Sequence, residues 1–387
     1  MISEHSRFLS VNWVDGMSIN KKHFIDQSHF HIQQNMDMYR LLCGPYAYGL
    51  IPSTAPNPQS VQLNFIVDNN IQLTAKLNHL SAITPGGAFI DINDNSSGEV
   101  ELSSPLPDQA SEGSVYQVVL TANPFKAQTM GLANPDETPP RKPYVTPLYR
   151  LNLIELNDAI DREIGLYELV IGQLTYDGST WEVDPNYIPP CYSIQAHIKL
   201  RERFKEAQAH LSLIEQHSIQ IIQKVRSKHQ DNTLALAISF ICQQILPLIG
   251  ANLSTFRQFA AHQPPSKIIE SAGSLARVFK NALDSWQGHG KDELMTYLSE
   301  WCNINQATLD NALHNLIVLE YKHTNIAPAL YSAIYLLEKI SAILPVLTGL
   351  DFIGERIETD LFVKEEMEEE EIVGTTERKK GFLKMKW

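Results

Sequence analysis

Three histidines near the start of the sequence, His23, His29 and His31, are the side chains best suited to holding a metal ion. The segment around them is expected to be helical, with Asn20 as its N-cap. Two imidazoles can share an ion only when they are three or four residues apart on one helical face. His29 and His31 lie about 200° apart around a helix, and His23 is six residues from His29. The spacing argues against a metal site and favours polar-face or interfacial histidines.

Glycine-containing motifs do not complete a nucleotide site either. Gly349 and Gly354 have the spacing of a phosphate loop, but Glu355 follows where that loop needs a lysine. The run "GHG" at 288–290 lacks the third glycine of a dinucleotide site, and neither Gly-x-Ser-x-Gly nor His-Glu-x-x-His occurs. The motifs predict a protein that is not an enzyme and has no cofactor or metal. A catalytic triad assembled from distant residues stays open as an alternative.

The composition of the chain indicates what kind of protein carries these residues. Apolar residues make up 43% and charged residues 19% of the 387 residues, which is typical of a folded protein with more than one domain. A formal charge of −13 argues against nucleic-acid binding, which rests on clustered Lys and Arg. The four cysteines lie far apart, as expected for a reducing cytoplasm, and no signal peptide is expected. Two long apolar segments, at 234–250 and 329–347, contain polar residues and proline and are expected to be buried bundle helices.

The hydrophobic period changes near Pro189-Pro190. Before it, alternation at 61–67 and 71–77 around "DNN" predicts a β-hairpin, and further strand patterns follow. After it, apolar residues recur at helical spacing. The sequence therefore predicts an α+β multidomain protein, with an antiparallel sheet domain over 1–192, a helical bundle over 193–320 and a C-terminal helical region over 321–363.

A regular stripe opens the helical half. Its apolar residues are spaced alternately four and three apart, as in a coiled coil or a helical bundle. The stripe includes Leu200, Phe204, Leu211, Ile214, Ile221 and Val225.

Both termini contain segments suited to docking. Trp13, Gly16 and Met17 precede the first helix, and the pattern leaves open whether Trp13 lies under the sheet as core or belongs to an arm that contacts another subunit. Residues 364–387 place six glutamates before a basic and aromatic end, so they are expected to be a solvated, flexible tail or a docking element. The residues that could dock are Arg378, Lys379, Lys380, Phe382 and Trp387.

Several short motifs resemble one family. "NWVDGM" with "KKHF", "PYAYGL", "LNHLSAITPGGAFIDI", "VYQVVL" and "WEVDPNYIPPCYSI" follow in the order and spacing of TssK, the baseplate protein of bacterial type VI secretion systems. The resemblance covers about half the chain.

The resemblance implies a homotrimeric cytoplasmic scaffold at the inner face of the inner membrane. It implies a β-sandwich "shoulder" that docks on the wedge proteins TssF, TssG and TssE, then a bundle, and a link to the inner-membrane anchoring complex. The opening arm of the shoulder would contain Trp13, Gly16, Met17, His23 and Phe24, at the wedge or between subunits. The stripe from Leu200 to Val225 would form the core of the bundle or of the trimer.

The end of the sequence departs from the family pattern. Family members continue into a small β-rich head, whereas residues 309–347 still have a helical pattern and the charged tail follows. A different membrane anchor is therefore expected. Two other functions stay open: a phage-type baseplate or receptor-binding protein, because the shoulder fold is shared, and a ligand-binding or hydrolytic enzyme.

Overall fold

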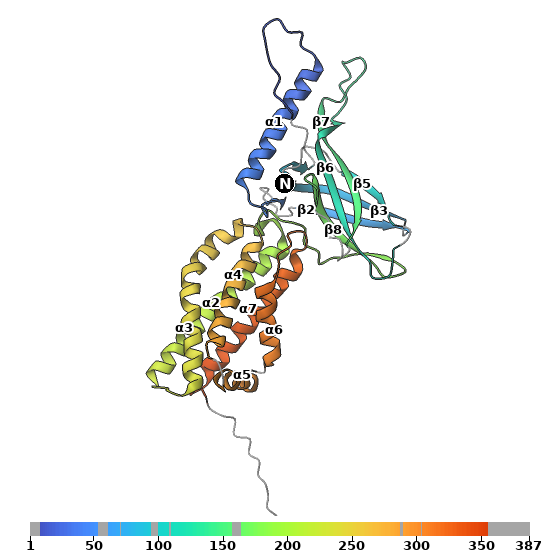
Figure 1. Ribbon diagram of the computed structural model, residues 1–387. Helices are drawn as coiled ribbons and strands as arrows, with labels where there is room; N and C mark the ends of the chain where they lie inside the picture. The colour runs from blue at the N-terminus through green and yellow to red at the C-terminus, as the bar shows by residue number, and fades with distance from the viewer. Residues whose placement is uncertain are drawn as a thin grey trace, which may run out of the picture. The chain divides into compact units, whose positions relative to one another are not determined.

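The first half of the chain forms two antiparallel sheets, as the alternating residues predict (Figure 1). In the first sheet β3, Gln72–Ile83, is central and pairs with β2, Val61–Asp68, across the expected hairpin turn. The other members are β1, Gly49–Leu50, β4, Phe89–Ile92, and β5, Val100–Pro105, each paired with β3. The computed structural model describes residues 8–354 apart from 53–60, 70, 94–99, 108–109, 157–163, 287–288 and 303.

The second sheet has the strand order β7-β6-β8-β9. These strands are β6, Val115–Met130, β7, Tyr144–Glu155, β8, Glu168–Tyr176, and β9, Trp181–Val183. Leu77 of the first sheet and Leu120 and Leu169 of the second belong to one buried core. A side chain at Gly172 would lie 2.8 Å from the ring of Phe65, so the two sheets pack closely there. The predicted sandwich is present.

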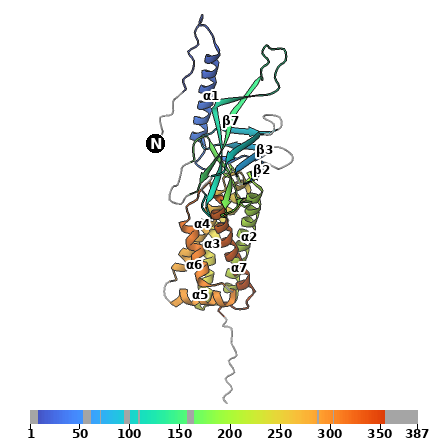
Figure 2. The ribbon, with the colours of Figure 1, turned by 90° about the vertical axis from the view of Figure 1, so that its right-hand side faces the viewer.

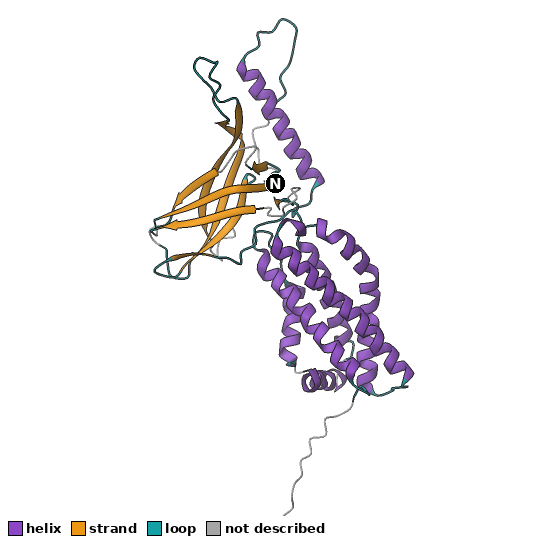
Figure 3. Cartoon of the chain, turned by 180° about the vertical axis from the view of Figure 1, so that it is seen from behind, coloured by secondary structure: helices purple, strands orange, loops and turns teal. Residues whose placement is uncertain are grey.

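Helices make up the second half (Figure 3). The bundle contains α2, Ile198–Ser227, α3, Thr233–Phe259, α4, Ser266–Asp284, α5, His289–Cys302, α6, Gln306–Val318, and α7, Ile326–Gly349, with 3₁₀ turns at Ile194–Ala196 and Ala260–His262. α7 packs against α2, α4 and α6. The described part of 321–363 therefore lies in the same bundle as 193–320. The α+β fold class is confirmed.

Two helical stretches of the described chain, Thr233–His262 and Ile326–Gly349, are long and apolar enough to cross a membrane by length and composition. About half of each apolar window is buried inside the protein, 44% and 56% respectively. Core helices pass the same test, so these stretches are weak evidence for a membrane protein.

The Pro189-Pro190 pair lies between β9 and the first turn of the bundle, where the period change predicts a junction. The backbone N–H of Leu50 donates to the carbonyl of Pro190 at 2.7 Å, and Leu50 forms a parallel bridge with Cys191. The first sheet is thus tied by backbone hydrogen bonds to the strand-like segment that leads into α2.

Candidate assembly surface

The first helix, α1, Lys21–Leu42, begins at the expected N-cap. The Asn20 side chain accepts from the backbone N–H of Lys22 at 2.9 Å, and Nδ1 of His23 accepts from the backbone N–H of Asn20 at 3.3 Å. This reciprocal arrangement satisfies two backbone donors at the start of the helix. Of the 22 residues in α1, Met36 alone is buried. A helix of this length with so little buried surface is suited to contact a partner.

The predicted arm residues come together at the start of α1. The backbone N–H of Met17 donates to the carbonyl of Val14 at 3.3 Å, and Gly16 adopts a φ of +81°, which favours glycine. This turn sends the chain back along its own path, so the arm and α1 lie side by side (Figure 2). The Trp13 ring centroid lies 6.1 Å from that of His23 and 6.0 Å from that of Phe24. Trp13 is 45% exposed, so it is not a core residue under the sheet.

Two glutamines hold the arm against α1. Oε1 of Gln27 accepts from the backbone N–H of Val11 at 3.0 Å, and Oε1 of Gln33 accepts from the backbone N–H of Phe8 at 2.9 Å. The Phe8 ring stacks on Phe125 of β6 with centroids 4.6 Å apart. Sequence reasoning missed these contacts, because a single glutamine on a polar helical face has no distinguishing pattern.

The arm and α1 together expose many large apolar side chains. These are Leu9, Val14, Ile19, Phe24, Ile25, Met38, Leu41 and Leu42, with exposed fractions from 41% to 85%. Contiguous exposed apolar surface marks a site for protein or membrane contact. Within the described residues, no group of three or more His, Cys, Asp or Glu side chains could hold a metal ion.

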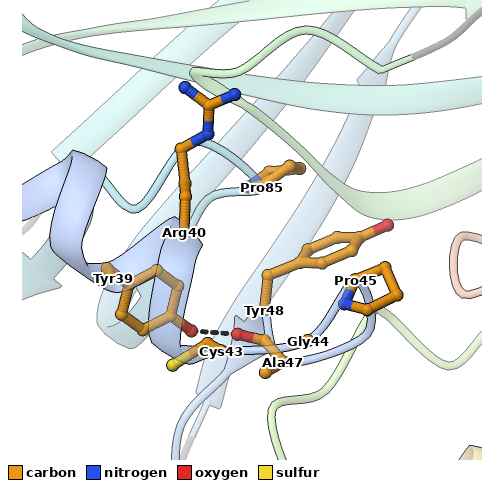
Figure 4. Close-up of a pocket in the computed structure, with 8 residues that line it drawn as sticks. All are labelled: Tyr39, Arg40, Cys43, Gly44, Pro45, Ala47, Tyr48 and Pro85. Atoms are coloured by element: carbon orange, nitrogen blue, oxygen red, sulfur yellow. Dashed lines mark hydrogen bonds between the residues drawn. The ribbon is translucent and has the colours of Figure 1, made fainter.

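A recess of about 320 Å³ lies at the C-terminal end of α1 (Figure 4). Its lining includes Tyr39, Arg40, Cys43 and Tyr48. The Tyr39 hydroxyl donates to the carbonyl of Ala47, and burial raises the pKa of Tyr39 well above its usual value. Burial, with a smaller effect from Tyr46, raises the pKa of Tyr48 to about 12. Both phenols are therefore neutral at neutral pH and act as hydrogen-bonding groups rather than as bases.

The stripe of α2 lies inside the bundle of a single chain. α2 packs against α3 and α7, and the six predicted stripe residues are 0% to 7% exposed. These six are Leu200, Phe204, Leu211, Ile214, Ile221 and Val225. Their apolar surface is used within the chain, which leaves almost none of it for a second subunit. The predicted docking residues of the tail, Arg378, Lys379, Lys380, Phe382 and Trp387, lie outside the described residues.

The protein thus has a two-sheet domain with an N-terminal arm and helix, followed by a helical bundle. No family model and no curated protein matches the chain. Among solved structures, it is similar to a crystal structure of TssK at 14% identity, covering 85% of this chain and 68% of that chain with a TM-score of 0.47. It is similar to TssK from EAEC bound to a nanobody at 15% identity, with 83% and 98% coverage and a TM-score of 0.44.

A third similar structure is a TssK-TssF-TssG baseplate subcomplex of a type VI secretion system. The identity is 16%, the coverage is 86% of this chain and 99% of that chain, and the TM-score is 0.46. The chain is therefore similar to the TssK family both in its short motifs and in these solved structures. With identities this low and TM-scores below 0.5, the likeness adds no functional argument of its own.

Proposed function

We propose that this chain is a structural component of a type VI secretion baseplate, a homotrimeric adaptor between the baseplate wedge and the cell envelope. The observation that carries the proposal is the arm and α1: an ordered turn and two glutamine contacts hold a long helix that exposes five large apolar side chains, Phe24, Ile25, Met38, Leu41 and Leu42. That surface is suited to protein contact, whereas the recess beside it holds phenols whose pKa burial raises further above neutral. The ordered motifs of the first half support TssK as the family.

The arm would dock on the wedge. By the resemblance, the wedge partners are TssF, TssG and TssE. Trp13 and the Gly16-Met17 turn would form the surface that contacts them. Trp13 is half exposed on a fixed backbone, so little conformational freedom is lost when it is buried by a partner. Three copies of a weak site in one trimer raise the effective concentration of each and give strong attachment. The adaptor would lie in the cytoplasm at the inner face of the inner membrane.

Co-expression with a wedge tests the proposal. The chain and TssF, TssG and TssE should elute together in size-exclusion chromatography, and light scattering should give the stoichiometry. Trp13→Ala should weaken wedge binding at least tenfold, because it removes an aromatic anchor. The matched control is Tyr331→Ala on α7, which removes an aromatic side chain that is 67% exposed but far along the chain from the arm. A chain that never binds a wedge, or a control that binds as poorly as Trp13→Ala, would contradict the proposal.

Gene neighbourhood separates the remaining functions. Sheath and tube genes of a secretion system beside this gene support the baseplate role. Capsid genes would instead indicate a phage protein.

A further inference from the structure

Residues 350–354, the last that the structure describes, follow the end of α7 and are held by other elements of the bundle. We call them the strap. α7 ends at Gly349, and Leu350 has extended backbone with a φ of −70° and a ψ of 142°. The side chain of Ile353 is 0% exposed and belongs to the buried core. A non-helical segment that enters the core needs partners for its backbone groups from elsewhere in the protein.

Two side-chain amides hold the backbone of Ile353 through both of its polar groups. The N–H of Ile353 donates to Oε1 of Gln230 at 3.0 Å, and its carbonyl accepts from Nδ2 of Asn232 at 2.9 Å. Oδ1 of Asn232 also accepts from the backbone N–H of Ala235 at 2.8 Å, so Asn232 caps α3 and holds the strap at the same time. The strap is thus bound to the connection between α2 and α3.

Further contacts fix the residues on either side of Ile353. The backbone N–H of Gly354 donates to the hydroxyl of Tyr297 on α5 at 3.0 Å. At the end of α2, Nζ of Lys228 donates to the carbonyl of Asp351 at 2.7 Å and lies 4.5 Å from the ring centroid of Phe352, which is a cation–π distance. The side chains that make these bonds to the strap belong to α5, to the end of α2 and to the connection that follows it, and not to α7.

Lys224 of α2 holds the last turn of α7. Its Nζ donates to the carbonyls of Thr348 and Leu350, and the hydroxyl oxygen of Thr348 lies 2.9 Å from Nδ1 of His217. The last carbonyls of a helix have no partner within the helix and form the negative end of its dipole, so a lysine there satisfies and stabilises them. Helix ends usually fray, whereas this end is fixed to α2.

The arrangement determines which contacts a pull on the chain beyond Gly354 would break first. A free helix end gives way one turn at a time, because its terminal residues have the fewest bonds. The strap gives way only when the hydrogen bonds of Ile353 and Gly354 and the burial of Ile353 are lost together. A pull would therefore act on α5 and on the end of α2, while α7 stays packed. α2 has 30 residues and begins directly after the 3₁₀ turn that follows the sheet domain, so it passes the tension to that domain.

We propose that the strap is a mechanical anchor, which passes tension from the residues after Gly354 to α2 and keeps α7 from unwinding. The mechanical property belongs to the chain itself. Its use rests on the proposed function, since an adaptor attached at two ends carries tension between them. Forced unfolding is governed by the rate at which contacts break rather than by equilibrium stability, so contacts that must break together resist tension best.

Single-molecule pulling of the full chain tests the anchor. One handle is attached at the C-terminus and the other at Glu202, an exposed residue near the start of α2. The first rupture of the parent should not release α7 alone. Asn232→Asp keeps the oxygen that caps α3 and removes the amide group that holds Ile353. In this variant the first rupture should need half the force of the parent or less, and it should release a contour length of about 100 Å, which corresponds to residues 326–354.

Gln230→Met keeps the length of the side chain, removes the oxygen that accepts from Ile353, and serves as the second variant if Asn232→Asp does not fold. The control is Ser341→Ala, which removes a 2.7 Å contact with His210 between α7 and α2, away from the strap, and should leave the first rupture unchanged. A parent that releases α7 alone, variants that rupture at the force of the parent, or a control that ruptures as easily as the variants would overturn the inference. A parent that behaves as expected but binds no wedge supports the anchor and contradicts the baseplate function.

Discussion

His323 joins the two halves of the protein through one ring nitrogen, and its other ring nitrogen bonds to a neighbour within the helical half. Its Nε2 donates to the carbonyl of Tyr48 at 3.0 Å, and its Nδ1 accepts from the hydroxyl of Tyr321 at 2.8 Å. The Tyr48 ring packs edge-on at a centroid distance of 4.6 Å. Burial lowers the pKa of His323 to about 4, and the hydrogen bond to Tyr48 opposes this effect. The side chain is 4% exposed, so it is held neutral in the contact between the sheet domain and the bundle, which we call the joint.

This lowered pKa predicts a loss of stability in acid. The unfolded chain binds a proton at His323 near pH 6.5, whereas the folded chain resists it down to about pH 4, so stability falls as pH decreases through this window. At pH 5 the loss from this group is about 2 kcal/mol relative to pH 7.5. His323→Gln should therefore show a smaller difference between its urea midpoints at pH 7.5 and pH 5 than the parent. The pKa of His197 is also lowered to about 4, by burial and by Lys199 and Arg201. Its contribution to the pH dependence is the same in the parent and in the variant, so it cancels in the comparison. Equal pH dependence of parent and variant would contradict the prediction.

A glycine close to the same joint gives a second prediction. Gly49 has a φ of +105°, and a Cβ there would lie 2.1 Å from the carbonyl carbon of Pro190. Gly49→Ala should therefore lower the unfolding free energy by at least about 3 kcal/mol through backbone strain and overlap. Gly44→Ala is the matched control, since a Cβ there meets nothing within 4 Å, and its effect should stay below about 1 kcal/mol. Thermal unfolding of the two variants tests this prediction, and the melting temperature of Gly49→Ala should be clearly lower than that of Gly44→Ala. Similar melting temperatures would show that the backbone near Pro190 can move to accept the added methyl group.

Sequence reasoning at the residue scale succeeded where the partners are close along the chain. Asn20 is recognisable as an N-cap because both of its partners, the Lys22 backbone N–H that donates to it and the His23 ring nitrogen that accepts from it, lie within three residues. The contact of His323 with Tyr48 joins residues 275 positions apart, and no local pattern marks it. The arm clamp through Gln27 was missed for the same reason.

At the scale of elements, periodicity predicted the buried face of α2 but not what would cover it. The four-and-three spacing is shared by helices that pack within a chain and helices that pack between chains. In the structure α3 and α7 cover the stripe. The sheets were predictable, since the alternating residues specify the hairpin, and Leu73, Ala75 and Leu77 are buried as the alternation predicts, whereas Ile71 at the turn is 70% exposed.

The packing of α2 predicts how its variants behave. Leu211→Ala or Ile214→Ala should cost about 2–5 kcal/mol of unfolding free energy, because each removes buried methyl groups and leaves a cavity. The subunit count in light scattering should not change, since both side chains are used within the chain. Leu213→Ala, a neighbouring leucine that is 40% exposed, is the control and should cost less than about 1 kcal/mol. Dissociation of the oligomer by Ile214→Ala, with stability unchanged, would contradict this prediction and place the subunit contact on α2.

At the scale of the whole molecule, the change of hydrophobic period predicted the order of sheet and bundle. The helical pattern of 309–347 is also present in the structure, since α6 contains 309–318 and α7 contains 326–347, with a non-helical connection at 319–325. The end of α7 is tied back to α2: Nζ of Lys224 donates to the carbonyls of Thr348 and Leu350, and Nζ of Lys228 donates to the carbonyl of Asp351 at 2.7 Å. The described chain therefore ends at a fixed point of the bundle, Gly354.

Residues 364–387, which follow this point, are the predicted attachment to the cell envelope. Six glutamates between Glu365 and Glu371 repel one another, whereas Arg378, Lys379 and Lys380 precede Phe382 and Trp387. The basic residues can approach anionic lipid headgroups, each contributing about 1 kcal/mol, and the aromatic residues can then enter the interface.

Deletion of 364–387 should abolish co-flotation with anionic vesicles while the subunit count and wedge binding stay unchanged. Salt should weaken the flotation of the full chain, because charge screening acts on the basic residues. Phe382→Ser with Trp387→Ser keeps the charge of the tail and removes its apolar anchors, so this double variant should bind the vesicles weakly and lose that binding at lower salt than the parent. A truncated chain that no longer assembles would show that the tail holds the subunits together. A truncated chain that still floats with the vesicles would place the attachment to the envelope on another surface.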